Sequence, residues 1–512
     1  MRGFGLVSMI LACGISLAET PLCGQSPSLS GVPISARQGL PIPRKPARGL
    51  PGPGESRSGP ARRDLGPGIR VVPTPAPRPA TKKTPTASNT LPRPAVPPAS
   101  DENDENDQFE DGDQAEGEHE GEEADDEAEE ESEEEEPELP PGLLGYALHG
   151  NEAITGEYIY TGEVFTNTRG GLNTQDATRY RGNLDLVLTA DSEKLGLWRG
   201  GQFFLYGMNT HGRTLTAEDV GDYQFYSNID TSPRPADVMQ VNEYWVLQQW
   251  GDGLLTCKVG KQDANADFAF ADLGGDFVNS SFGLVPTVPL PTYPNPGLGV
   301  AGFVLLTDGL RLLTGIYDGG PDGGQWGFNT LGEFGAISLY QLEWHPQFGS
   351  DGLFPGTYRV GAWYHSHDFE EVGTDTPRTL SGNHGFWATA DQMIWKESLD
   401  GADEQGIGVF GQFGWAPDDR NAVDCYYGGG LVYRGWLDGR DDDICGVGMA
   451  NVLYGSRVTA FDGSTHETVV ECFYKAMLSP YVSLQPDLQY IATPSGMHRD
   501  ALVAGTRFEV VF

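Results

Sequence analysis

The feature that most limits how this chain can fold is a repeated alternation of apolar and polar residues, which continues from about residue 145 to residue 512. Each stretch runs for about 9 to 13 residues and ends in a turn. In the segment LLTCKVGKQ, Leu255, Cys257 and Val259 fall on one face of an extended chain, and Thr256 and Lys258 fall on the other. Each predicted strand therefore has one apolar and one polar face.

The number of these stretches and the lengths of their connections indicate a closed barrel. Short turns such as GDG and TDG alternate with long loops, notably residues 207–237 and 263–297. An even number of strands with this asymmetry is typical of an antiparallel up-and-down β-barrel in an outer membrane. We therefore predict an all-β transmembrane barrel over residues 145–512. About sixteen stretches can be counted, near residues 157–169, 178–192, 199–209, 239–250, 254–263, 298–307, 310–317, 334–345, 356–366, 384–396, 406–415, 422–435, 443–454, 467–478, 481–491 and 500–512.

A soluble β-protein with half-buried strands shows the same alternation, so the pattern alone does not decide which solvent the apolar faces meet. After the first 20 residues, no run of about 18 apolar residues could form a spanning helix, which excludes a helical membrane protein. A secreted soluble β-protein stays open as an alternative. Its apolar faces would have to be covered by other layers of the protein.

The first residues predict export. The segment MRGFGLVSMILACGISLAET has a basic start at Arg2, an apolar run over residues 4–17 and a Ser-Leu-Ala sequence that ends at Ala18. This combination is typical of a signal peptide over residues 1–18. A lipoprotein site at Cys13 fits less well, because the apolar run before it is short.

Two segments of biased composition precede the predicted barrel. Residues 19–100 are rich in Pro and Arg and predict a disordered linker, because they have too little apolar surface to offset the entropy of ordering. Residues 101–141 are acidic and contain no Lys or Arg. We expect this segment to be a solvated periplasmic spacer. Contact with periplasmic cations such as calcium, or with a partner protein, is the alternative.

The overall charge and the motifs argue against other functions. The net charge is −40, which repels the phosphate backbone of nucleic acids. The segment GLGVAG at residues 297–302 fits a dinucleotide motif, but it follows a Pro-rich segment and leads into a predicted strand instead of a helix. His365 and His367 could bind a metal, although solvation at the base of a loop is the preferred interpretation. We predict no enzymatic activity, no cofactor and no metal, with a barrel-type outer-membrane enzyme as a remote alternative.

Several separated segments carry a family resemblance, in the same order along the chain. They are DQMIW at residues 391–395, GGGLVYRGWLDGRDDDICGVGMA at 428–450, LSPYVSLQPDLQYIATPSG at 478–496 and VGKQDANADFAFADLGGDFVNSSFG at 259–283. Together they resemble the carbohydrate-selective porin (OprB-like) family. The resemblance covers nearly everything from residue 145 to 512. It implies a sixteen-stranded outer-membrane barrel through which sugars diffuse passively, with long loops that fold inward and narrow the pore. The long N-terminal region departs from the family pattern.

A sugar filter needs hydrogen-bonding groups for hydroxyls and aromatic planes for the C–H faces of the ring, and it must bind weakly. Residues on the polar strand faces and in the loop over residues 263–297 supply both kinds of group, and the Pro-rich end of that loop, VPLPTYPNP, limits its freedom. The alternative is that these groups only solvate the channel or brace the loop. The candidate pore-lining residues are Lys258, Gln262, Asp263, Asn265, Phe268, Asp272, Phe277, Asn279, Phe282 and Arg359.

These observations predict an outer-membrane porin for small sugars. The expected partners are small sugars, outer-membrane lipid and further copies of the chain in a homo-oligomer. The alternative function is a general diffusion porin that prefers cations because of the acidic composition.

Overall fold

The computed structural model describes most of the predicted barrel. The predicted signal peptide (1–18), linker (19–100) and acidic segment (101–141) lie outside the described residues. In the part that is described, no helix has the length and apolar character needed to cross a membrane. The described ranges are residues 153–231, 237–251, 253–320, 324–349, 352–398 and 405–512.

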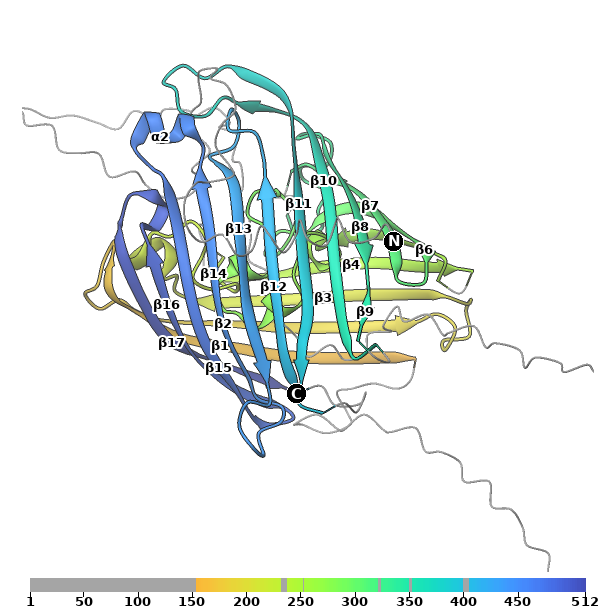
Figure 1. Ribbon diagram of the computed structural model, residues 1–512. Coiled ribbons are helices and arrows are strands. Elements are labelled where there is room, and N and C mark those ends of the chain that lie inside the picture. Colours follow the sequence, from red (N-terminus) through yellow and green to blue (C-terminus); the bar gives the residue numbers. More distant parts are fainter. Residues whose placement is uncertain (1–152, 232–236, 252, 321–323, 350–351, 399–404) are drawn as a thin grey trace, which may run out of the picture.

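The described residues form one sheet of seventeen strands, each antiparallel to its neighbours. The sheet closes because β1 pairs with β17, for example Tyr160 with Val510. β9 is only two residues long, so the ring itself has sixteen long strands (Figure 1). The strands are β1 (Ile154–Gly171), β2 (Thr178–Asp191), β3 (Gly201–Gly212), β4 (Val238–Trp250), β5 (Leu255–Gln262), β6 (Gly297–Thr307), β7 (Leu310–Asp318), β8 (Ala336–Trp344), β9 (Gln347–Phe348), β10 (Phe354–Glu370), β11 (Thr379–Lys396), β12 (Gly406–Trp415), β13 (Val423–Arg434), β14 (Ile444–Tyr454), β15 (His466–Ser479), β16 (Val482–Ala492) and β17 (Arg499–Val511).

The predicted barrel and its strand count are confirmed, and most strand ends lie within about three residues of their predicted positions. The largest difference is the hairpin of β10 and β11, which is longer than predicted at its outer end. There the pairing continues to Glu370 opposite Thr379, past an irregularity in the register between His365 and Asp368. Such a bulge interrupts the alternation of side chains, and this explains why the period-two pattern ended early.

The burial pattern is the reverse of that in a soluble protein. On β10, Val360 is 54% exposed, whereas its neighbour Arg359 is buried. On β16, Leu488 is exposed and Gln489 is buried. Apolar side chains thus cover the outside of a closed ring, and polar side chains face inward. Because a contiguous apolar surface of this extent needs an apolar solvent, the barrel is a membrane protein, and the soluble alternative is wrong.

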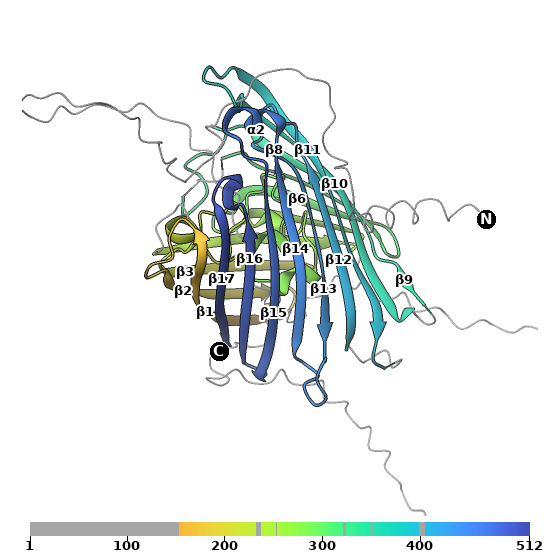
Figure 2. The same ribbon diagram turned by 60° about the vertical axis from the view of Figure 1, so that its left-hand side comes forward.

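Short helices accompany the long connections. They are η3 (Thr216–Val220), η4 (Ala264–Ala266), η5 (Leu273–Asp276), η6 (Ser280–Phe282), α2 (Ser456–Asp462) and η8 (Pro494–Gly496). Two connections fold into the barrel, and Figures 1 and 2 show the corresponding green segments inside the ring of strands. We call residues 213–231, after β3, the first inner loop, and residues 263–296, between β5 and β6, the second inner loop.

The rings of the second inner loop fit against β14 because glycines of that strand lie beneath them. Gly446 and Gly448 lie on β14. A Cβ atom at Gly448 would lie 2.6 Å from the ring of Phe282 and 2.8 Å from that of Phe277. Any larger residue at this position would displace the loop, so glycine here permits the close approach.

Candidate constriction site

The first part of the second inner loop follows the inner wall of the barrel from β5 past β10 to β15. Three Asp side chains of this part are partly exposed to the lumen, and each one pairs with a basic side chain of the wall. The ion pairs are Asp267 with Lys258 of β5 at 2.7 Å, Asp272 with Arg359 of β10 at 2.8 Å, and Asp276 with Lys475 of β15 at 3.1 Å. We call these three pairs the ion-pair row.

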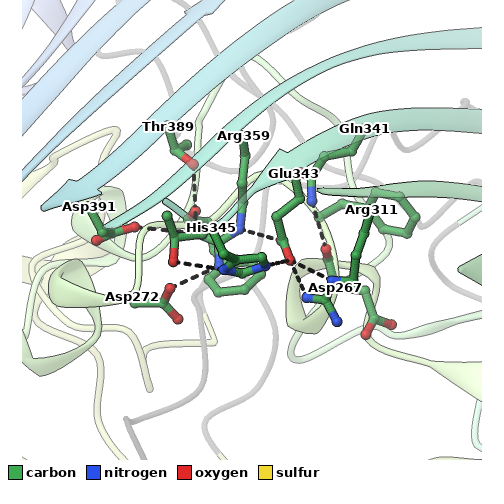
Figure 3. A network of polar contacts seen from close by, with 12 residues as sticks. Asp267, Asp272, Arg311, Gln341, Glu343, His345, Arg359, Thr389 and Asp391 are labelled. Carbon is green, nitrogen blue, oxygen red and sulfur yellow. Dashed lines mark hydrogen bonds and ion pairs between the residues drawn. The ribbon is translucent and has the colours of Figure 1, made fainter. Parts of the chain in front are cut away.

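Arg359 of the middle pair is almost completely buried, and Figure 3 shows the acidic side chains around it. Its Nε donates to Glu343 at 2.8 Å, its Nη1 donates to Asp391 at 3.2 Å, and its Nη2 donates to Asp272 at 2.8 Å. The guanidinium carbon also lies 4.1 Å from the ring centroid of Phe270. Bonds between a fixed guanidinium fork and several carboxylates are strong and directional, so Arg359 holds the loop in one position.

Glu343, on β8, is shared by several donors. It accepts hydrogen bonds from Arg311 on β7 and from His345 at 2.6 Å, in addition to Arg359. A nearby amide, Gln341, donates to the backbone oxygen of Asp267 at 3.2 Å. The wall strands β7, β8, β10 and β11 thus form one polar network that faces the loop.

Within this network only a few groups reach the lumen. The side chain of Asp272 is 30% exposed, and Phe270 is half-buried. A partly exposed carboxylate accepts hydrogen bonds from hydroxyl groups, and an aromatic ring offers a plane for the C–H face of a sugar. Since both are held by a buried Arg359, their positions do not have to be ordered again for each solute.

A second polar cluster lies on the wall formed by β1 and β17. Arg507 pairs with Glu163, and its guanidinium also donates to Asn228 of the first inner loop. The other oxygen of Glu163 accepts a hydrogen bond from Ser227 at 2.7 Å. The first inner loop is therefore attached to the wall by buried, charge-assisted hydrogen bonds.

The two inner loops also bind each other. The backbone N–H of Asn228 donates to the carbonyl of Val278 at 2.8 Å, and the N–H of Ser280 donates to the carbonyl of Phe225 at 3.1 Å. All the candidate loop residues predicted from the sequence for the constriction lie in the single loop over residues 263–297. The structure shows a constriction in which two loops share backbone hydrogen bonds.

Of the predicted pore-lining residues, Lys258, Asp272 and Arg359 take part in the ion-pair row. Gln262 instead donates to the carbonyl of Gly299 at 2.9 Å and braces the neighbouring strand. Asn265 donates its side-chain amide to the carbonyl of Phe268 at 3.1 Å, within the loop.

Asp263 and Asn279 each begin a short helix. The Asp263 carboxylate accepts from the N–H of Asn265 at 2.9 Å and from that of Tyr293 at 3.2 Å, which joins the two ends of the loop. The Asn279 side chain accepts from the N–H of Ser281 at 3.0 Å. Both are typical N-cap interactions, and both side chains are buried.

The three predicted aromatic residues lie away from the lumen. Phe268 is fully buried, and Phe277 and Phe282 are 1% and 0% exposed. The rings of Phe277 and Phe282 are 4.3 Å apart, and Phe277 packs edge-on against Phe473 of β15 at 4.9 Å. These rings fill the space between the loop and the glycine-containing wall.

Sequence reasoning missed several residues of this site, namely Asp267, Asp276, Asp391 and Lys475. Lys475 could have been predicted from the sequence, because it shares the parity of the inward-facing Glu471 and Phe473 on β15. The loop acids could not have been predicted, because no periodicity indicates which loop side chains face the lumen.

Comparisons with known proteins agree with this architecture. The model of a family described as carbohydrate-selective porin, OprB family, matches residues 175–512. Porin B of Pseudomonas aeruginosa is 25% identical over 396 residues, which cover 69% of this chain and 86% of that protein. The fold is similar to that of the high-pH structure of OprB from Pseudomonas putida, with a TM-score of 0.64 and 24% identity over 70% of this chain and 94% of that one.

Proposed function

Because this chain belongs to the OprB family of carbohydrate-selective porins, we propose that its ion-pair row and Phe270 form the surface along which small sugars pass. The protein is an outer-membrane porin for passive diffusion of sugars. The observation that carries the proposal is the arrangement at Arg359, which holds Asp272 and Phe270 at the edge of the lumen. Hydroxyl acceptors beside an aromatic plane suit a sugar and bind it weakly enough to release it.

The predicted lining residues have two roles in this proposal. Lys258, Asp272 and Arg359 contact or orient the solute. The remaining residues hold the loop in place, because their polar atoms are bonded within the loop or to the wall, or because their rings are buried. These are Gln262, Asp263, Asn265, Phe268, Phe277, Asn279 and Phe282.

Replacing Asp272 with Asn tests the proposal, because the change keeps the size of the side chain and removes its charge. We expect glucose to block ion current about fivefold less well, which corresponds to one lost hydrogen bond of about 1 kcal/mol. The measurement is single-channel current in planar bilayers with stepwise addition of glucose. Asp419→Asn is the matched control, because Asp419 pairs with Arg420 outside the ion-pair row. Equal block in the Asp272 variant and the parent would refute the role of the row.

A general diffusion porin that prefers cations is the second candidate. The observation that favours it is the presence of buried acids on the inner wall, including Glu467, Glu471 and Asp487. Reversal potentials in asymmetric salt measure ion preference directly. A cation-preferring pore that glucose does not block would favour this alternative over sugar selectivity.

The family is one of channels, and we propose that the chain has no catalytic activity. Esterase and phospholipase assays on the purified barrel test this.

We further propose a homo-oligomer, as the family suggests, which native mass spectrometry in detergent would detect. For the acidic segment 101–141 we propose the role of a periplasmic spacer, and calcium binding is the competing role. Isothermal titration calorimetry of that segment with calcium separates the two roles, because only the calcium-binding role predicts a heat of binding.

A further inference from the structure

The inner face of β15 holds the first inner loop through a single carboxylate. Glu467 is fully buried and accepts hydrogen bonds from the backbone N–H groups of Tyr223 at 2.7 Å and Gln224 at 2.8 Å. It also accepts one from the N–H of Ser495 in η8. All three donors favour the ionised form of Glu467.

The same face of β15 holds the second inner loop in the same way. Glu471, four residues along the strand and also fully buried, accepts from the N–H groups of Val278 at 2.6 Å and Asn279 at 2.9 Å. One strand therefore anchors both loops of the constriction.

A second carboxylate lies beside Glu467 without any such donors. Asp222 of the first inner loop is 2% exposed, and neither of its side-chain oxygens accepts a bond from an N–H group of another described residue. The donors that act on this carboxylate are weak ones, the buried Thr216 hydroxyl and the N–H of Asp222 itself. Burial and the negative charge of Glu467 raise the pKa of Asp222 well above its ordinary value.

The charged and titratable groups around Asp222 come from three elements. Asp230, on the same loop, adds negative charge, and Arg181 of β2 is engaged by Asp230 at 3.4 Å. Tyr226, also on this loop, is a buried phenol whose pKa is raised by burial. On the side of β17, the ring of His498 approaches Gly221, which precedes Asp222. Burial of two carboxylates that act on each other favours the uptake of one proton by the pair.

We propose that Asp222 is a proton-operated latch, which when protonated lets the first inner loop dock on Glu467 of β15, and which when ionised releases that loop. Asp222 carries the proton because Glu467 already accepts three N–H bonds, whereas no N–H group of another described residue donates to Asp222. The latch regulates the constriction, because the first inner loop bonds to the second through Asn228 and Ser280.

The sign of the pH dependence follows from linkage. The docked loop binds more protons than the released loop, in which Asp222 titrates near its ordinary pKa of about 4. The contribution of Asp222 to docking is therefore fully present below that pH and is lost as the pH rises through its raised pKa. Alkaline conditions should release the loop.

Chymotrypsin tests the latch because Tyr223, Phe225 and Tyr226 are protected while the loop is docked. We expect the parent barrel, reconstituted in vesicles, to be cleaved at these residues about tenfold faster at about pH 9 than at about pH 6. Asp222→Asn should be cleaved slowly at both pH values. Asp375→Asn is the matched control, because Asp375 is an exposed loop acid, and it should behave as the parent does.

Two outcomes overturn the proposal. One is pH-independent cleavage of the parent, and the other is an Asp222→Asn barrel that keeps the parent's pH dependence. Heat-modifiable gel mobility shows whether each variant is folded. Glu467→Gln removes the repulsion between the two carboxylates and serves as a second variant that should lose the pH dependence. The assay contains no sugar, so its result is independent of the proposed sugar pathway.

Discussion

The two halves of the second inner loop are built on different principles. In residues 266–276 the three Asp side chains are partly exposed, and this half meets the wall through the ion-pair row. From Phe277 onward the loop is almost entirely buried and meets the wall through rings that pack over glycines. The first half supplies the chemistry of the lumen, and the second half supplies the attachment. A loop can thus present charges at a precise position because its other half is packed as tightly as a protein core.

The largest effect should come from removing the packing. Replacing both Phe277 and Phe282 with Ala leaves a cavity against β14, and such truncations cost about 3–5 kcal/mol each in a packed core. The cost falls on the docking of the loop, because the ring of strands does not depend on it. We expect higher and noisier single-channel conductance together with weaker glucose block. Unchanged conductance and block would show that the ion-pair row alone holds the loop.

A smaller effect should come from adding a side chain to the wall at a glycine that the loop contacts. Gly448→Ala places a Cβ atom within 3 Å of both rings, and overpacking of this kind costs about 1–3 kcal/mol. Gly411→Ala on β12 is the matched control, because no atom lies within 4 Å of the added Cβ. Protease cleavage within residues 277–290 should increase for the first variant and stay at the parent's rate for the second. Similar cleavage of both would contradict the close fit at Gly448.

The smallest effect should come from the exposed side of the loop. Lys475→Met leaves Asp276 without its cationic partner and adds one uncompensated negative charge at the lumen. We expect a modest shift of the reversal potential toward cations, with the loop still docked. The shift should shrink in strong salt, because the Debye length falls from about 30 Å at 0.01 M to about 3 Å at 1 M. Arg440→Met, which removes a cation from the short connection between β13 and β14, should leave the reversal potential unchanged.

Part of the arrangement at β15, the strand that anchors both inner loops, could be predicted from the sequence. The parity of β15 places Glu467, Glu471 and Lys475 on one face, and that face is the inner one. Their roles could not be predicted, because their partners lie about 200 residues or more away along the chain, at Asn279 and Gln224. Hydrogen bonds to loop backbone leave no mark on the local composition.

The sequence by itself determined the barrel: the number of strands, and which side of each strand faces lipid. That information is local, because the pleat forces successive side chains to opposite faces, so Arg359 and Val360 could be assigned from their neighbours alone. Only the tertiary structure decided which loop residues line the lumen. Phe270 and Phe277 sit in similar sequence surroundings, yet one lies over Arg359 at the edge of the lumen and the other packs against the wall. Loop side chains follow no period, and contacts with distant strands set their direction.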